Sequence, residues 1–486
     1  MSSRAILNIL KRNTTANTSP SSSNIWNGNT NEPGPLKNVR VVDVCEVISG
    51  PYTSGLLADL GADVIKIEKT NGVGDSFRLS QPRGPKVNDE SSPHHDETIG
   101  MAFAIANRGK RSIALNLQEK KGVDILKQIV KDADVFVQNW RPGVAGRLGV
   151  SYDELKKINP KLIYLSISGY GQTGPYVKKK VYDSVIQAQI GMANINGTGN
   201  GQNEPRAPQL LPNAVIDKTT SHTAVHAILA ALYARDASGG NNNNNNNNSN
   251  NNASNEGQHI ELSMMDAGLS YIYPDSYSKY WTDENISHES NIAMVFDIWE
   301  MIDGAATVVA LWGEPEFDRL ITKFPYLQEI KDNPKFSDRR KRLSNKPEFT
   351  KEWNRIAVHE NKINVEDFLN ACEELSIPAG KVSGPQDIFD DPQMKHMNSL
   401  VKSQNNLYGE TIQPRPPYIF SKTKLSKKIK STPMYGEHSI EILERLGYSP
   451  SEIEMLKRDK VFAKGIPKDS FLHALDVSAL RPAKKK

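Results

Sequence analysis

The chain has 486 residues, which is long enough for one large domain or two ordinary ones with sizeable apolar cores. Its 60 basic and 56 acidic residues give a net charge of +4, which does not point to nucleic acid or a membrane surface as a partner. The 2 cysteines lie far apart and suggest neither a disulfide framework nor a multi-cysteine metal site. No apolar run reaches the roughly 20 residues that span a bilayer. We therefore expect a soluble protein that binds neither nucleic acid nor membrane.

The first 35 residues differ in composition from the rest of the chain. Serine, threonine and asparagine dominate there, Arg4, Lys11 and Arg12 supply positive charge, and no acidic residue precedes Glu32. This composition is typical of a mitochondrial transit peptide, with a disordered polar tail as the alternative. We predict a mitochondrial protein, and cytoplasmic or peroxisomal locations remain alternatives.

Strand-like and helix-like segments alternate from residue 39 onward. The apolar patterns predict strands at 39–44, 62–67, 112–117, 133–138, 162–168 and 258–262, and helices at 52–60, 121–132, 152–158, 217–234 and 439–446. Such alternation favours an α/β fold built on a doubly wound, mostly parallel sheet.

The composition of successive segments predicts two domains, an insertion and a tail. Residues 239–256 are rich in asparagine and cannot bury apolar surface, so we expect a disordered insertion there. A large Rossmann-like domain is expected over 36–285 and 404–465, a smaller mixed α/β domain over 286–403, and a basic tail over 466–486.

Spacing disfavours two common cofactor sites. The turn after the first strand holds only Gly50, followed by Pro51, so the glycine pattern that lets backbone amides approach a dinucleotide pyrophosphate is missing. The adjacent histidines His94 and His95 lack further ligands at zinc spacing. We expect neither a metal nor a permanently bound cofactor.

Asp217 lies where a long apolar-periodic helix is predicted to begin. An aspartate at this position is most often an N-cap, whose carboxylate accepts a hydrogen bond from a free backbone amide. The position also suits a nucleophilic carboxylate, because helix-end amides would keep it ionised and nearby donors could stabilise an oxyanion. The pattern itself leaves both roles open.

A series of ordered motifs runs from about residue 36 to residue 461. The motifs are Val41-Val42-Asp43-Val44, Gly50-Pro51, Leu57-Ala58-Asp59-Leu60-Gly61-Ala62-Asp63-Val64-Ile65-Lys66-Ile67-Glu68, Asn107-Arg108-Gly109-Lys110-Arg111-Ser112, Asn139-Trp140-Arg141-Pro142-Gly143, Ser168-Gly169-Tyr170-Gly171-Gln172-Thr173-Gly174-Pro175 and Gly436-Glu437-His438-Ser439. In these motifs the chain resembles the class III CoA-transferases, the family that includes formyl-CoA and carnitine CoA-transferases and 2-methylacyl-CoA racemases. Its central part is similar to the mitochondrial transferases that act on dicarboxylic acyl-CoAs.

The resemblance implies a reaction and a nucleophile. In the family, an aspartate ahead of a helix with an Ile-Leu-Ala-Ala-Leu-like run is the nucleophile, and Asp217 ahead of residues 228–232 matches it. The implied enzyme is a CoA-transferase that exchanges CoA between an acyl-CoA and a free carboxylic acid through an aspartyl-CoA thioester. The coenzyme A thioester is then a substrate, and the family's interlocked homodimer is the expected assembly.

The same resemblance implies a set of CoA contacts. The matching positions are Val47 and Ile48 after the first strand, Leu115 against the adenine, and the phosphate-binding cations Lys69, Arg147 and Lys180. Gln118 stands where some relatives have lysine. An ordinary solvated surface residue is the alternative for each cation.

Two other functions remain as alternatives. Racemases of the family use a His-Asp pair as a base near neutral pH, but the matching residues here are Tyr182 and Asp183, and a phenol is a poor base. The family's transferases commonly carry an aromatic residue there, so a transferase is favoured. A CoA-binding protein that has lost turnover is disfavoured because Asp217 is present.

Overall fold

The computed structural model describes residues 25–26, 33–70, 72–84, 98–197, 207–239, 255–277, 297–308, 313–405 and 409–465. Most of the predicted transit peptide, the asparagine run, the pair His94 and His95, and the basic tail lie outside these ranges. The chain divides into two compact units, one of Met1–Leu269 with Ser399–Lys486 and one of Ser270–Asn398.

A seven-stranded sheet in the order β12-β3-β2-β1-β4-β5-β6 forms the centre of the first unit. Its strands are β1 (Arg40–Asp43), β2 (Asp63–Glu68), β3 (Lys110–Leu115), β4 (Val135–Gln138), β5 (Ile163–Ser168), β6 (His259–Ser263) and β12 (Phe462–Ala463). All neighbours pair in parallel except β12, which is antiparallel to β3. The predicted α/β class with a mostly parallel sheet is confirmed. The strand order reverses between β1 and β4, and ligands of such sheets bind beyond the carboxyl ends of the strands at this reversal.

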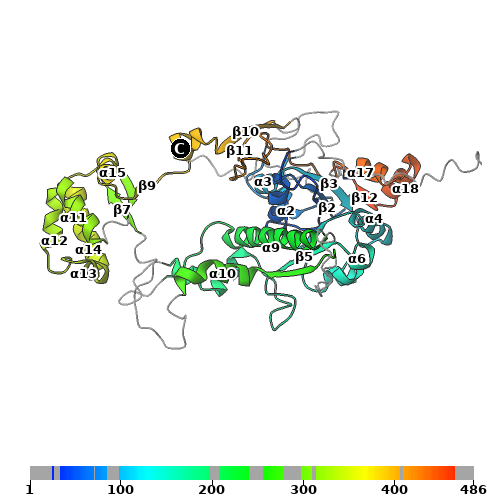
Figure 1. Ribbon diagram of the computed structural model, residues 1–486, viewed down its shortest axis with the longest axis horizontal. Coiled ribbons are helices and arrows are strands. Elements are labelled where there is room, and N and C mark those ends of the chain that lie inside the picture. The colour runs from blue at the N-terminus through cyan, green and yellow to red at the C-terminus, as the bar shows by residue number, and fades with distance from the viewer. Residues whose placement is uncertain are drawn as a thin grey trace, which may run out of the picture. The chain divides into compact units, whose positions relative to one another are not determined.

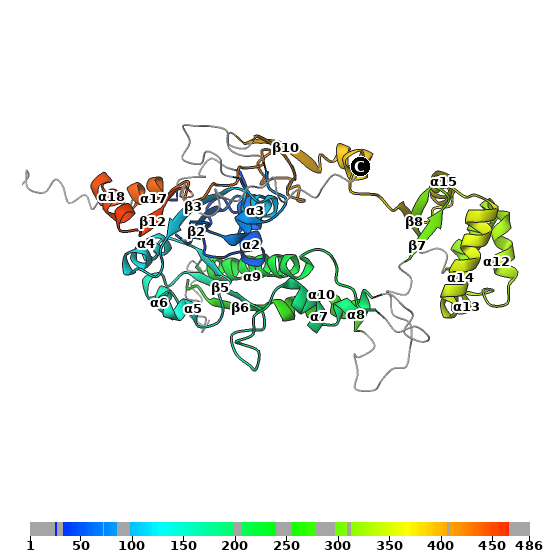
Figure 2. The same cartoon turned by 180° about the vertical axis from the view of Figure 1, so that it is seen from behind.

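Helices flank this sheet. The first unit contains α2 (Ser49–Asp59), α3 (Met101–Asn107), α4 (Lys120–Val130), α5 (Val144–Arg147), α6 (Tyr152–Ile158), α7 (Asp183–Gln189), α8 (Met192–Ile195), α9 (Val215–Gly239), α17 (Ser439–Arg445) and α18 (Pro450–Arg458), and α10 (Met264–Ser276) begins in the first unit and ends in the second. Helices α2 and α9 lie side by side in both views of the chain (Figures 1 and 2). Within the described residues, no helix has both the length and the apolar character that a membrane span requires.

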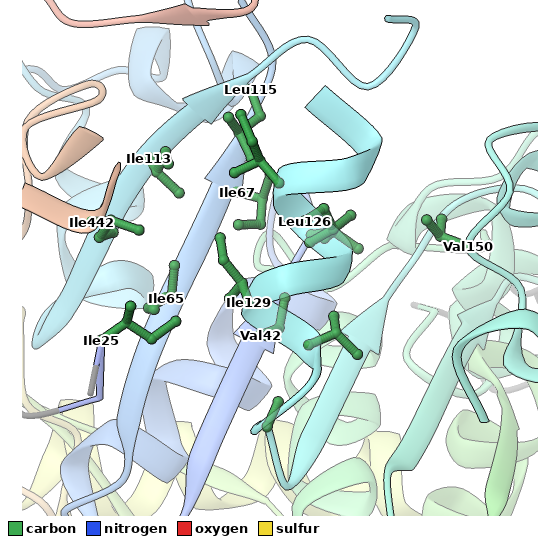
Figure 3. Packing of buried hydrophobic residues seen from close by; sticks show 14 of the residues in the cluster. Ile25, Val42, Ile65, Ile67, Ile113, Leu115, Leu126, Ile129, Val150 and Ile442 are labelled. Atoms are coloured by element: carbon green, nitrogen blue, oxygen red, sulfur yellow. The ribbon is translucent and has the colours of Figure 1, made fainter. Parts of the chain in front are cut away.

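The apolar core on one face of the sheet contains a segment from the predicted N-terminal tail. Side chains of β1, β2 and β3 pack there against α4, α17 and α18. Ile25 and Trp26 join this core with exposed fractions of 3% and 4%. Figure 3 shows Ile25 among Ile65, Ile113 and Ile442. At least these two residues of 1–35 therefore belong to the folded unit.

The second unit has its own sheet and core. Strands β7 (Ile298–Met301), β8 (Gly304–Val308) and β9 (Ala379–Lys381) form an antiparallel sheet beside α11 (Glu314–Lys323), α12 (Gln328–Asp332), α13 (Arg339–Ser344), α14 (Lys346–Trp353) and α15 (Val365–Glu374). Its core combines aliphatic side chains with several aromatic ones, and the ring of Trp299 is centred 5.5 Å from those of Phe349 and Trp353. The hairpin of β10 (Leu400–Asn405) and β11 (Gly409–Pro414) returns the chain to the first unit.

Candidate active site

Asp217 lies inside the first turn of α9 and is 9% exposed. The helix begins at Val215, earlier than predicted, and the backbone N–H of Asp217 donates to Oδ2 of Asp183 at 2.9 Å. Asp183 therefore accepts the helix-end hydrogen bond, and Asp217, as the third residue of α9, does not occupy the N-cap position that was one of its two possible roles. Its own carboxylate remains available for chemistry.

The protonation of Asp217 is set mainly by its burial. Burial, and next the nearby carboxylate of Asp183, raise the pKa of Asp217 from 3.8 to about 7. Hydrogen bonds from the hydroxyl and backbone N–H of Ser49, together with the charge of Lys218, lower it by less. Burial therefore opposes the helix-end amides, which favour the ionised form, because it leaves the carboxylate little contact with water. Near neutral pH both the protonated and the ionised form of the Asp217 carboxyl group are therefore populated.

Ser49, which sequence reasoning missed as a site residue, is the first residue of α2 and joins this helix to α9. Besides its hydrogen bonds to the Asp217 carboxylate, its carbonyl oxygen lies 2.7 Å from the hydroxyl of Ser221. The same hydroxyl lies 2.8 Å from the carbonyl oxygen of Asp217. The only available sequence signal was the turn that Ser49 forms with Gly50. A Cβ at Gly50 would lie 2.3 Å from Sγ of Cys45, so this turn requires glycine.

Val47 and Ile48 connect β1 to α2 at the point where the strand order reverses. Both are partly exposed, as a contact with CoA requires. Val47 has a φ of 72°, a region that costs a β-branched residue about 1–3 kcal/mol. Backbone strain of this kind occurs mostly at functional sites, because only surrounding contacts can maintain it.

The predicted phosphate-binding cations all follow strands at their carboxyl ends. Lys69 follows β2, Arg147 ends α5 after β4, and Lys180 lies in the loop between β5 and α7. All three are exposed, and the topology brings them to one edge of the parallel sheet. Lys69 forms an ion pair with Glu46, and its carbonyl oxygen accepts a hydrogen bond of 2.8 Å from the hydroxyl of Tyr435.

The remaining predicted residues have differing surroundings. Leu115 ends β3 at the same edge but is 1% exposed and packs in the core, so its adenine contact stays a prediction. Tyr182 precedes α7 and is 71% exposed. Asp183 uses both carboxylate oxygens, since Oδ1 accepts from Nε2 of Gln187 at 2.6 Å and Oδ2 accepts from Asp217. Tyr182 and Asp183 are adjacent in sequence, but only Asp183 has a described contact with Asp217.

Proteins already characterised or solved resemble this chain in sequence and in fold. The profile of CoA-transferase family III matches residues 36–439. The succinate–glutarate CoA-transferase of Agrobacterium fabrum is 31% identical over 421 residues, covering 86% of this chain and 96% of that protein. The succinyl-CoA:glutarate CoA-transferase of Homo sapiens is 29% identical over 434 residues, covering 87% and 89%. A crystal structure of a CaiB/BaiF family protein from Brucella suis matches with a TM-score of 0.69 at 27% identity, covering 85% of this chain and 100% of that one. The chain therefore belongs to CoA-transferase family III and is an enzyme of the CoA-transferase class.

Proposed function

We propose that the enzyme exchanges CoA between two carboxylic acids through a thioester formed on Asp217. The observation that carries this proposal is the buried carboxyl group of Asp217 at the start of α9. Its pKa is raised to about 7, and it accepts hydrogen bonds from Ser49 at the start of α2. A poorly hydrated carboxylate that ionises near neutral pH suits nucleophilic attack on a thioester.

The proposed reaction balances without a metal, an oxidant or a net proton transfer. An oxygen of ionised Asp217 attacks the carbonyl carbon of the donor acyl-CoA, and the C–S bond breaks to give a mixed anhydride and CoA thiolate. The thiolate attacks the Asp217 carbonyl carbon, which releases the donor acid and forms the aspartyl-CoA thioester. The acceptor carboxylate then repeats these steps in reverse. The hydroxyl and N–H of Ser49 are suitably placed to stabilise negative charge that develops on the aspartyl oxygen.

We propose dicarboxylic acids of the succinate and glutarate type as donor and acceptor. Support comes from the names of the Agrobacterium and human relatives. CoA is proposed to lie along the carboxyl edge of the sheet, with Val47 and Ile48 beside it and the adenine near Leu115. The cations proposed for its phosphate groups are Lys69, Arg147 and Lys180. No permanently bound cofactor is part of this proposal.

The surroundings of Tyr182 and Asp183 support a transferase over a racemase. Proton transfer at the carbon next to the thioester needs a base that titrates near neutral pH. Tyr182 carries a phenol in place of imidazole, and both oxygens of Asp183 already accept hydrogen bonds. The imidazole that would titrate near neutral pH as the racemase base is therefore missing at this position.

Intact-mass spectrometry tests the proposal directly. The purified enzyme is incubated with succinyl-CoA, glutaryl-CoA and other acyl-CoAs, and one portion is then treated with hydroxylamine. We expect a CoA-sized adduct that hydroxylamine removes, absent from Asp217→Ala and present in Asp153→Ala, which replaces an exposed aspartate in the first turn of α6. Absence of an adduct with every donor, together with deuterium exchange at the α-carbon of a 2-methylacyl-CoA, would contradict the transferase and favour a racemase.

We further propose an interlocked homodimer and a mitochondrial location. The dimer follows from the family resemblance, and a monomer in multi-angle light scattering would contradict it. The location is supported by the basic, acid-free composition ahead of Glu32. Because Ile25 and Trp26 are buried in the core, we expect N-terminal sequencing of the mitochondrial protein to find a cut before residue 25.

A further inference from the structure

The turn that carries Ser49 to Asp217 contains a residue in an unfavourable conformation. Val47 has a φ of 72°, and branching at Cβ makes this left-handed region unfavourable. Ile48 and Ser49 follow directly, so the backbone direction at Val47 determines where α2 begins. The relaxed conformation of Val47 would move Ser49 relative to Asp217.

Buried charged side chains hold both ends of this turn. Oδ1 of Asp75 accepts the N–H of Val47 at 3.1 Å, and Nζ of Lys66 donates to the carbonyl oxygen of Cys45 at 2.8 Å. The two side chains also form an ion pair, with 3.1 Å between Nζ and Oδ2. The side chain of Asp75 is 1% exposed and that of Lys66 is 0% exposed.

The middle peptide groups of the turn are held by Asn139, the residue that follows β4. Oδ1 of Asn139 accepts the N–H of Glu46 at 3.1 Å, and Nδ2 of Asn139 donates to the carbonyl oxygen of Glu46 at 2.8 Å. Between them, Asn139, Lys66 and Asp75 bind backbone groups of each residue in the turn 45–47.

Further buried charges anchor Asp75 in place. Its backbone N–H donates to Oε2 of Glu68 at 3.1 Å, and Glu68 is paired with Arg78 at 2.6 Å. Lys66 lies 4.0 Å from Asp43, a second buried carboxylate. Buried ion pairs are costly to desolvate and are often no more stabilising than apolar side chains of the same volume. Oδ1 of Asp75 also accepts the N–H of Phe77 at 3.0 Å, so this group, which runs from Lys66 in β2 to Asp75 in the segment after the strand, holds the strained turn as well as the start of the next helical turn.

We propose that Asp75 is a positioning residue, whose carboxylate holds the left-handed turn at Val47 and thereby places the N–H and hydroxyl of Ser49 against Asp217. Asp75 acts through the turn and touches neither Asp217 nor the reacting atoms. This inference rests on the proposed role of Asp217 as the nucleophile.

An asparagine at position 75 has one acceptor oxygen and one NH2 donor, so it cannot accept from both the N–H of Val47 and the ammonium of Lys66. The first test therefore compares Asp75→Asn with a matched variant, Asp63→Asn. Asp63 begins β2 and forms a similarly buried ion pair with Arg111 at 2.9 Å, at the opposite end of the strand. In single turnovers with succinyl-CoA, we expect the folded Asp75→Asn enzyme to form the aspartyl-CoA adduct about 10²-fold more slowly, and Asp63→Asn to match the wild type. In hydrogen–deuterium exchange, amides 45–49 should exchange faster in Asp75→Asn alone.

The second test adds Val47→Gly, because glycine adopts a positive φ without strain. If Asp75 acts by holding the strained turn, Asp75→Asn should slow adduct formation much less in the Val47→Gly background than in the Val47 background. Should Asp75→Asn alone fail to fold, Val47→Gly is expected to restore folding to it, but not to a destabilised Asp63→Asn.

The outcomes separate the two proposals. An equal slowing in both backgrounds, a rate in Asp75→Asn equal to that of the wild type, or a double variant that still does not fold would overturn the positioning role alone. Failure of the wild type to form any adduct would instead overturn Asp217 as nucleophile, and the positioning role with it.

Discussion

The backbone N–H of Asp217 donates a hydrogen bond to a carboxylate oxygen of Asp183, with 2.9 Å between nitrogen and oxygen. Two carboxyl groups therefore meet at the start of α9. Asp183 stabilises the helix end, and its charge adds to burial in raising the pKa of Asp217. The same contact thus supports the fold and adjusts the ionisation of the proposed nucleophile.

Replacing Asp183 by asparagine should move the pH dependence of catalysis. The variant Asp183→Asn keeps an oxygen that can accept the Asp217 N–H but removes the like charge. We therefore expect the pH midpoint of adduct formation, near 7 in the wild type, to fall, so that the variant gains relative rate in acid. Stopped reactions between pH 5 and 9, analysed by intact mass, give this midpoint. Asp153→Asn serves as the control, and a midpoint that stays the same or rises would argue against the coupling.

Asp217 should reduce stability at neutral and alkaline pH. Its pKa in the folded protein, about 7, lies above the ordinary value of 3.8, so the folded state binds more protons between these values and its stability falls as pH rises through this window. We expect Asp217→Asn to be more stable than the wild type at pH 8, by up to about 4 kcal/mol, and the difference to shrink toward pH 4. Urea unfolding at several pH values measures it. A difference that grows as pH falls would contradict the raised pKa.

The ion pair between Lys69 and Glu46 should compete with a CoA phosphate for the lysine. Lys69→Ala is expected to raise KM for the acyl-CoA roughly tenfold with little change in kcat, because a phosphate contact is made equally in the ground and transition states. Glu46→Gln, which frees the lysine, should lower KM. Lys402→Ala, which removes an exposed lysine paired with Glu410 in the hairpin, controls for general loss of charge. Steady-state kinetics at two salt concentrations measure KM for each variant. An unchanged KM in Lys69→Ala would show that Lys69 does not bind a CoA phosphate.

Trp26 should contribute to the stability of the first unit although it belongs to the predicted tail. Its ring is 4% exposed in the core shared with α4 and α17, so Trp26→Ala should leave a cavity and lower the free energy of unfolding by about 3–5 kcal/mol. Trp26→Phe, which keeps most of the apolar volume, should lose less. Thermal unfolding followed by circular dichroism compares the three proteins, and equal melting temperatures would place Trp26 outside the core in solution.

The elements of the fold were predictable from local pattern. The helix predicted at 152–158 coincides with α6, whose start is marked by the capping box of Ser151 and Glu154. Strands β1, β4 and β5 follow the predicted apolar runs because strands buried on both faces of a parallel sheet need mostly apolar sequence, whereas β6 at the sheet edge is only partly buried. Asp217 could be singled out only through the resemblance, since a cap and a nucleophile have the same local pattern.

The sequence by itself determined the alternation of strands and helices, the α/β class and, through its motifs, the family and the position of Asp217. The tertiary structure decided the partners of that residue. Asp183 lies 34 positions away from Asp217, and the contact between Ser49 and Ser221 spans 172 positions. Burial, and with it the raised pKa of Asp217, arises only when α2, α7 and α9 pack together. Local patterns record backbone preference and apolar periodicity, whereas desolvation and hydrogen bonding at the site depend on which distant segments the sheet brings side by side.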